Sequence, residues 1–172
     1  CCGIERIYVH KKVFNQFVEG AVELTKQYKL GNPLDTETNL GPVAKKSGAD
    51  TVMAHIQKAV QAGAKALIDP ALFPNTSLGY NYLAPQILIH VDHTMDVMVE
   101  ETFGPVVGIM PVDNDEQAIE LMNDSPYGLT ASVWTEDEDA AVRIADKIET
   151  GTCFMNRCDY LDPYLAWTGV KN

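Results

Sequence analysis

Hydrophobic residues recur along the chain with two different spacings, which predict strands and helices. Alternation in steps of two, or a short unbroken apolar run, is typical of strands. Recurrence in steps of three and four is typical of an amphipathic helix. Strands are expected at residues 5–10, 64–68, 83–91, 97–100, 106–112, 129–134 and 151–156. Helices are expected at residues 11–29, 47–62 and 115–123, and a further helix is expected to follow the capping-box residues 135–138 and to end at about Ile148.

Local signals indicate where several of these elements begin and end. Gly63 is expected to stop the second helix. Asp113 and Asn114 are capping candidates for the helix at 115–123. Thr135 and Glu138 have the spacing of a capping box, which predicts that Thr135 caps the last helix.

The later half alternates strand, helix, strand, helix, strand, which predicts an α/β fold. We expect a mostly parallel, twisted sheet with helices on both faces. No repeat or linker divides the sequence, so residues 1–172 are expected to belong to one domain. Working groups in such sheets gather where strands end and loops begin. Three segments therefore become candidates together: Cys1-Cys2, Glu100–Pro105 and Asn156–Trp167.

The composition and net charge of the chain disfavour some classes of binding partner. The chain has 172 residues, of which 46% are hydrophobic, and a net charge of −11. This charge argues against a nucleic acid or an anionic membrane surface as partner. No apolar run is long enough to span a bilayer, and the start does not resemble a signal peptide. With only four cysteines, a reducing compartment is expected, either the cytoplasm or the mitochondrial matrix, rather than secretion.

The cysteine pair Cys1-Cys2 stands directly before the first expected strand. An exposed thiol with a lowered pKa forms a thiolate, which is a strong nucleophile. The alternative is that both cysteines are small apolar residues packed beside a strand. The residues alone leave both interpretations open.

The segment Glu100–Pro105 combines two carboxylates, an aromatic ring and a Gly-Pro pair. A carboxylate at a strand end can accept hydrogen bonds from both hydroxyls of a ribose, and Phe103 could lie against a planar ring. The alternative is a solvated acidic loop.

Three further features bear on the candidate chemistry: the segment that begins at Asn156, the histidines His90 and His93, and the known nucleotide-binding motifs. The segment Asn156–Pro163 mixes thiol, aromatic and carboxylate groups, as ligand-binding loops often do, although a plain surface loop is equally compatible. His90 and His93 lack a third ligand nearby in sequence, so no metal site is predicted. No Gly-x-Gly-x-x-Gly or P-loop motif occurs, so most of any nucleotide site must come from elsewhere.

These segments, in this order, resemble the aldehyde dehydrogenase superfamily over essentially the whole chain. The most specific similarity is Glu100-Glu101-Thr102-Phe103-Gly104-Pro105, which looks like the family's E-E-x-F-G-P motif. The other matching segments are Cys1 to Val9, Gly31-Asn32-Pro33, Gly41-Pro42, Asn123 to Thr135, Gly151 to Asn156 and Trp167 to Lys171.

The resemblance implies a role for each candidate residue. Cys1 would be the catalytic nucleophile, because Arg6 follows it by five residues as in the family. Glu101 would bind the nicotinamide ribose and Phe103 would pack near the nicotinamide ring. The residues that would line the aldehyde pocket are Cys2, Cys158, Leu161 and Trp167.

The implied reaction is oxidation of a small-molecule aldehyde to a carboxylic acid with NAD or NADP, through a cysteine thiohemiacetal and thioester. The resemblance also implies that a dinucleotide-binding domain and a C-terminal oligomerisation strand are missing from this chain. The isolated chain is therefore expected to be inactive, and the full-length protein to form a homodimer or homotetramer. Two alternatives stay open: a dehydrogenase that transfers the acyl group to coenzyme A, and a non-catalytic binding or structural relative.

Overall fold

The computed structural model describes residues 3–171, which divide into two compact units. One unit comprises Ile4–Pro111, and the other contains Gly3 and the residues from Val112 onward. The division falls at the last residue of a strand, so no flexible linker separates the two units along the chain. Among the helices built from described residues, none is long and apolar enough to cross a membrane.

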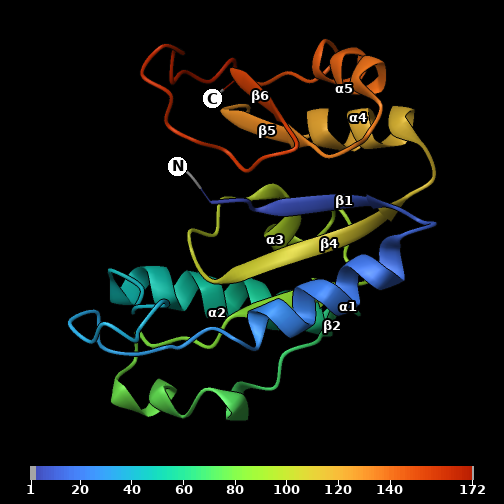
Figure 1. Ribbon diagram of the computed structural model, residues 1–172. Coiled ribbons are helices and arrows are strands. Elements are labelled where there is room, and N and C mark those ends of the chain that lie inside the picture. The colour runs from blue at the N-terminus through green and yellow to red at the C-terminus, as the bar shows by residue number, and fades with distance from the viewer. Residues whose placement is uncertain (1–2, 172) are drawn as a thin grey trace. The chain divides into compact units, whose positions relative to one another are not determined.

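The first unit is a four-stranded sheet with helices on both of its faces (Figure 1). The strands are ordered β1-β4-β3-β2; β3 and β4 are parallel, and β2 is antiparallel to β3. The elements of this unit are β1 (Arg6–His10), α1 (Phe14–Thr25), α2 (Lys46–Gln61), β2 (Lys65–Ala66), the 3-10 turns η1 (Pro70–Leu72) and η2 (Pro74–Leu78), β3 (Gln86–Ile89), α3 (Asp96–Val99) and β4 (Val106–Val112).

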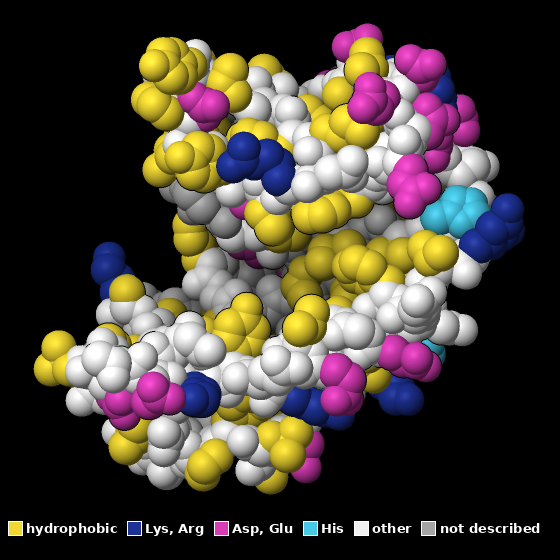
Figure 2. Space-filling model, viewed as in Figure 1, with side chains coloured by type: hydrophobic (Ala, Val, Ile, Leu, Met, Phe, Trp, Pro, Cys, Tyr) yellow, Lys and Arg dark blue, Asp and Glu magenta, His cyan; other side chains and the backbone are white. Residues whose placement is uncertain are grey.

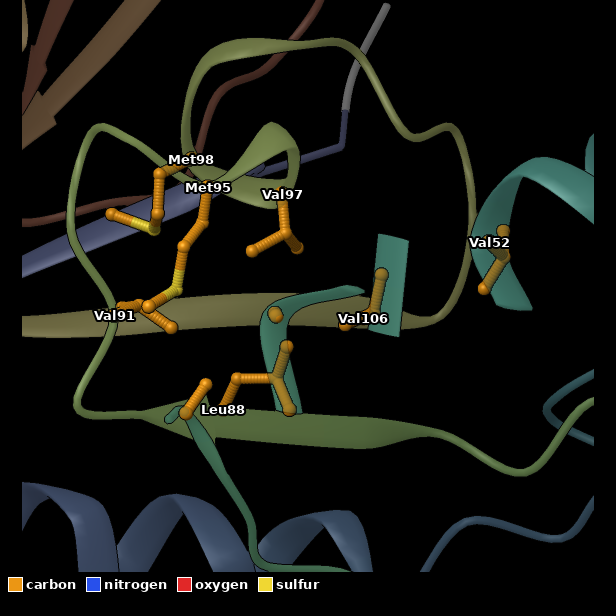
Figure 3. Packing of buried hydrophobic residues seen from close by; sticks show 9 residues of the cluster. Val52, Leu88, Val91, Met95, Val97, Met98 and Val106 are labelled. Carbon is orange, nitrogen blue, oxygen red and sulfur yellow. The ribbon is translucent and has the colours of Figure 1, made fainter. Parts of the chain in front are cut away.

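Successive residues of β3 serve opposite faces of the sheet. Ile87 packs with Ile109 and Val18 of α1 on one face. Leu88 packs on the other face with residues of α2 and α3, because successive strand side chains point in opposite directions. Figure 3 shows Leu88 and Val106 from the sheet with Met98 of α3 in this second cluster. Both faces of the central strands are therefore buried, as the unbroken apolar run at 106–112 predicts.

The second unit is a parallel pair of strands covered by two helices (Figure 1). Ala131 of β5 and Ile144 of α5 are buried together in its core. The elements are α4 (Asp115–Asn123), β5 (Thr130–Val133), α5 (Glu138–Ala145) and β6 (Thr152–Met155). Together the two units confirm the α/β class and the mostly parallel strand arrangement.

The predicted boundaries of several elements are confirmed where a local signal fixes them. The apolar run at 106–112 is β4 without any change of bounds. Gly63 follows α2 with a φ of 110°, a conformation that glycine adopts without a Cβ clash. Asn114 caps α4 by accepting a hydrogen bond from the Gln117 N–H at 2.9 Å.

Two predictions about local structure are wrong. Residues 97–100 are not a strand: α3 is a single helical turn in which Val97 and Met98 are buried, so packing overrides the β-propensity of its valines. Thr135 does not cap α5, because Asp137 accepts the hydrogen bond from the Ala140 N–H. Thr135 Oγ1 instead accepts from the Asp137 N–H at 3.1 Å, which fixes the turn before the helix.

Acidic residues are concentrated in the second unit. Residues 112–172 contain 13 Asp and Glu against four Lys and Arg, whereas residues 4–111 contain 11 against nine. Figure 2 shows acidic side chains gathered where α4 and α5 lie. Both helices begin with two acidic residues, which favours the positive end of the helix dipole.

Gln86 takes the place of backbone pairing beside β2. Its buried amide oxygen accepts hydrogen bonds from the N–H groups of Leu67 and Ile68, and its amide nitrogen donates to the Ile68 carbonyl at 2.9 Å. The Leu67 N–H also donates to the Ile87 carbonyl at 3.0 Å. The side chain therefore replaces strand pairing for the Ile68 N–H and carbonyl, which follow the two-residue strand β2.

We expect Gln86→Leu to lower the free energy of unfolding by about 3 kcal/mol, because it removes the hydrogen bonds of the buried Ile68 N–H and carbonyl groups. Urea denaturation followed by circular dichroism measures the change. The exposed Gln61 at the end of α2 provides the control, and Gln61→Leu should change stability by less than about 0.5 kcal/mol. Equal effects of the two substitutions would contradict the proposed pairing role.

Candidate functional site

The segment Glu100–Pro105 links α3 to β4 as an irregular loop, which we name the Glu101 loop. Within it, Glu101 is exposed, Thr102 is 2% exposed and Phe103 is 58% exposed. The chain thus turns a carboxylate and an aromatic ring to solvent on either side of a buried threonine.

Packing beneath the Glu101 loop explains why it holds this form. Thr102 Oγ1 lies 2.9 Å from Nδ1 of His55, which is buried on α2. Gly104 approaches α2 so closely that a Cβ at this position would overlap the side chain of Val52. The next residue, Pro105, accepts a hydrogen bond through its carbonyl from the Gln86 N–H at 2.7 Å, which joins the loop to the sheet.

Phe103 has a positive φ of 49°, which is uncommon for a residue other than glycine. Such a conformation persists only where the surroundings hold it, and it occurs preferentially at functional sites. The N–H groups of Thr102 and Phe103 each donate to the carboxylate of Glu5, at 3.2 Å in both cases. The loop is therefore held both from α2 and from the residue that precedes β1.

The segment that follows β6 carries the other predicted pocket residues. Cys158 and Leu161 are exposed and Trp167 is half-buried. The segment begins at Asn156, whose side-chain amide exchanges two hydrogen bonds with the backbone of Thr135, at 2.8 and 2.9 Å. This exchange fixes the start of the segment.

Charged and aromatic side chains lie together within this segment. The Arg157 guanidinium lies over the ring of Tyr160, 4.6 Å from its centroid, and 5.8 Å from that of Phe154. Oδ2 of the half-buried Asp159 is buried and has no hydrogen-bond partner among the described residues. A buried carboxylate oxygen without a donor is costly, so this atom is a candidate for contact with a ligand.

The predicted site residues are distributed over both units. Glu101 and Phe103 share one loop of the first unit, whereas Cys158, Leu161 and Trp167 share one segment of the second unit. Cys1 and Cys2 lie outside the described residues. In the part of the chain that the structure describes, no three His, Cys, Asp or Glu side chains gather as a metal site would require. His93 instead contacts the Tyr8 hydroxyl through Nε2 at 2.7 Å.

The sequence profile of the aldehyde dehydrogenase family matches residues 1–172. The chain belongs to the aldehyde dehydrogenase family. Among curated relatives, human 4-trimethylaminobutyraldehyde dehydrogenase is 32% identical, with 99% of this chain and 35% of the relative aligned. The 2-hydroxymuconic semialdehyde dehydrogenase of Pseudomonas putida is 35% identical over 99% of this chain and 36% of its own length. The chain thus spans about a third of the length of these aldehyde dehydrogenases.

Solved aldehyde dehydrogenase structures share the fold. Betaine aldehyde dehydrogenase from Staphylococcus aureus in complex with NAD+ matches with a TM-score of 0.88 and 28% identity, over 97% of this chain and 33% of that one. An NADP-dependent glyceraldehyde-3-phosphate dehydrogenase from Bacillus halodurans, complexed with NADP, matches with a TM-score of 0.90 and 34% identity, over 99% and 35%. Solved members of the family therefore include both NAD and NADP complexes.

Sequence reasoning assigned no individual role to four residues of this site, although two of them lie in candidate segments: Glu5, His55, Thr102 and Asp159. One of them had a usable signal, because His55 recurs at helical spacing with Val52 and Ala59 on the buried face of α2. No periodic signal links Glu5 or Thr102 to partners about a hundred residues away.

The two described cysteines differ in reactivity. Burial raises the pKa of the Cys153 thiol, because the charged thiolate is poorly solvated there, while Cys158 is exposed. Alkylation requires the thiolate, so near pH 7.5 we expect iodoacetamide to label Cys158 at least about ten times faster than Cys153. Raising the pH should speed labelling of Cys153 as its thiolate forms. Peptide mapping by mass spectrometry measures both sites, with Cys158→Ser as the control for assignment. Equal rates would contradict the burial argument.

Proposed function

We propose that this chain is part of the catalytic domain of an NAD(P)-dependent aldehyde dehydrogenase. The observation that carries the proposal is the Glu101 loop, which presents an exposed carboxylate and an exposed ring around a buried threonine. Family members of similar fold bind NAD+ or NADP. Because the chain spans about a third of its relatives, the activity is proposed for a polypeptide that also contains a dinucleotide-binding domain and assembles as a homodimer or homotetramer.

The residues of the Glu101 loop fit a nicotinamide nucleotide. Glu101 would accept hydrogen bonds from the ribose hydroxyls, which an exposed carboxylate can do without losing another partner. Phe103 would pack against the nicotinamide ring with its exposed face. NAD(P)+, when bound, supplies the acceptor for the hydride that the aldehyde loses.

Cys1 is the proposed nucleophile, on the strength of the family resemblance at residues 1–9. Its thiolate would add to the aldehyde carbon and form a thiohemiacetal. Loss of hydride from that carbon leaves a thioester, and water then cleaves the carbon–sulfur bond to release the carboxylic acid and the free thiol. Cys2, Cys158, Leu161 and Trp167 are proposed to line the aldehyde pocket.

Substitution of the proposed nucleophile tests this assignment. In the complete polypeptide with NAD(P)+ and a panel of aldehydes, Cys1→Ala should lower kcat by roughly a thousandfold or more, because no other group forms the thioester. The control is Cys153→Ala, which removes a half-buried thiol of the β5–β6 core and should leave most of the activity.

The same assay separates the alternatives. Absence of turnover in the intact protein would favour a non-catalytic relative. Turnover that requires coenzyme A and yields an acyl thioester would favour the acylating reaction. Full activity in Cys1→Ala would remove the assignment of the nucleophile.

Asp159 favours an aldehyde with a positively charged end. The curated relatives named above differ in substrate, since one acts on a trimethylamino aldehyde and the other on a muconic semialdehyde. Asp159 lies between the proposed pocket residues Cys158 and Leu161, and its buried Oδ2 has no partner among the described residues. A cationic substrate group near this side chain would offset the negative charge of its carboxylate, and the excess of acidic residues in this unit would favour the approach of such a group.

We expect Asp159→Asn to raise the KM for 4-trimethylaminobutyraldehyde about tenfold, because the substitution removes an electrostatic attraction between the carboxylate and the cationic end of the aldehyde. The KM for an uncharged aldehyde of the same length should change by less than about twofold. Steady-state kinetics with both substrates measures the difference. Asp162→Asn is the control, since Asp162 already accepts a hydrogen bond from the Tyr164 N–H at 2.9 Å. An equal effect on both aldehydes would contradict the proposed substrate class.

A further inference from the structure

We infer that Glu5 is a positioning residue for the coenzyme site, because its carboxylate fixes the conformation of the Glu101 loop. Oε2 of Glu5 accepts a hydrogen bond from the Thr102 N–H, and Oε1 accepts one from the Phe103 N–H, both at 3.2 Å. Each oxygen of one carboxylate thus binds one of two consecutive N–H groups. Hydrogen bonds to an ionised acceptor are stronger than those between neutral groups.

The geometry of the loop explains why a carboxylate is required. Consecutive N–H groups converge on one point where the backbone takes a left-handed residue, and such concavities bind anions. Phe103 supplies that residue, with its φ of 49°. The left-handed conformation is unfavourable for any residue that has a Cβ atom. An anion bound to the two N–H groups would offset this cost at Phe103. A glutamine at position 5 would offer one uncharged amide oxygen in place of two charged oxygens, and its amide nitrogen cannot accept, so it would bind the two donors more weakly.

The consequence for the site lies in where the side chains point. With the backbone held in this form, Thr102 is directed inward to His55 and Phe103 is directed to solvent. If Phe103 relaxed to a negative φ, the two N–H groups would no longer converge and its ring would change direction. Glu5 therefore sets the direction of the ring proposed to contact the nicotinamide, without touching the coenzyme itself.

A second contact from the neighbouring residue makes the attachment rigid. Arg6 donates from Nη1 to the carbonyl of Met98 at 2.9 Å, just before the Glu101 loop. Glu5 and Arg6 thus both reach the segment 98–103 from the start of β1.

The test is Glu5→Gln in the complete polypeptide, with Glu19→Gln on the exposed side of α1 as the matched control. We expect hydrogen exchange at the Thr102 and Phe103 amides to accelerate at least tenfold in Glu5→Gln alone. We expect the dissociation constant for NAD(P)+ to rise about tenfold, because binding must then also order the loop. Glu5→Asp keeps the charge on a shorter side chain and should give an intermediate affinity.

Several outcomes would overturn the inference. Unchanged amide exchange in Glu5→Gln would show that the carboxylate does not hold the loop. Faster exchange with unchanged coenzyme affinity would show that Glu5 stabilises the loop but does not position the coenzyme site. If Glu5→Gln does not fold, the inference stands or falls on Glu5→Asp, which must weaken coenzyme binding and accelerate exchange at the same two amides.

The inference depends on the proposed function, and one further variant separates the two. Glu101→Gln should weaken NAD(P)+ binding if the loop is the coenzyme site. If it does not, the proposed function is wrong. If Glu101→Gln weakens binding while Glu5→Gln does not, only the role of Glu5 is wrong.

Discussion

Burial on both faces of the parallel pair β3–β4 is the constraint on which the first unit depends. Ile87 and Ile109 are buried against α1, while Leu88 and Val106 are buried against α2 and α3. A shift of either strand by one residue would exchange the two faces, so the pairing register is strongly fixed. Because β4 begins at Val106, its register also fixes the end of the Glu101 loop, where the Pro105 carbonyl accepts a hydrogen bond from the Gln86 N–H.

The Glu101 loop has little freedom between this fixed end and α3. The side of the loop that faces α2 is filled by Gly104 against Val52 and by the contact of Thr102 with His55. The polar backbone groups on its other side are bound by Glu5. Such a loop can present Glu101 and Phe103 in a preorganised form, which reduces the entropy that a ligand must remove on binding.

Elements with a strong local signal could be predicted from the sequence, and those determined by distant contacts could not. β4, α2 and α4 have long periodic or apolar runs with clear stops, and their predicted bounds agree with the structure within one residue. α3 was mistaken for a strand because two valines in four residues favour β structure when their burial is unknown.

The candidate site was predicted unevenly for the same reason. Its exposed residues were found through the motif at 100–105, whereas the groups that support them, Glu5 and His55, were not. The rule that ligands bind at the carboxyl ends of parallel strands also gave only part of the answer. The Glu101 loop precedes β4, so this segment lies at the amino end of its strand.

The separation of Glu5 from Thr102 along the sequence, 97 residues, has a consequence for folding. Closing so long a loop requires a large loss of chain entropy, which only the burial of the sheet between the two residues can offset. We expect contacts of this kind to form late, after the nearer strand pairings, because long-range loop closure slows folding. A chain that has collapsed without completing its sheet would therefore contain most of its helices and yet lack an ordered Glu101 loop.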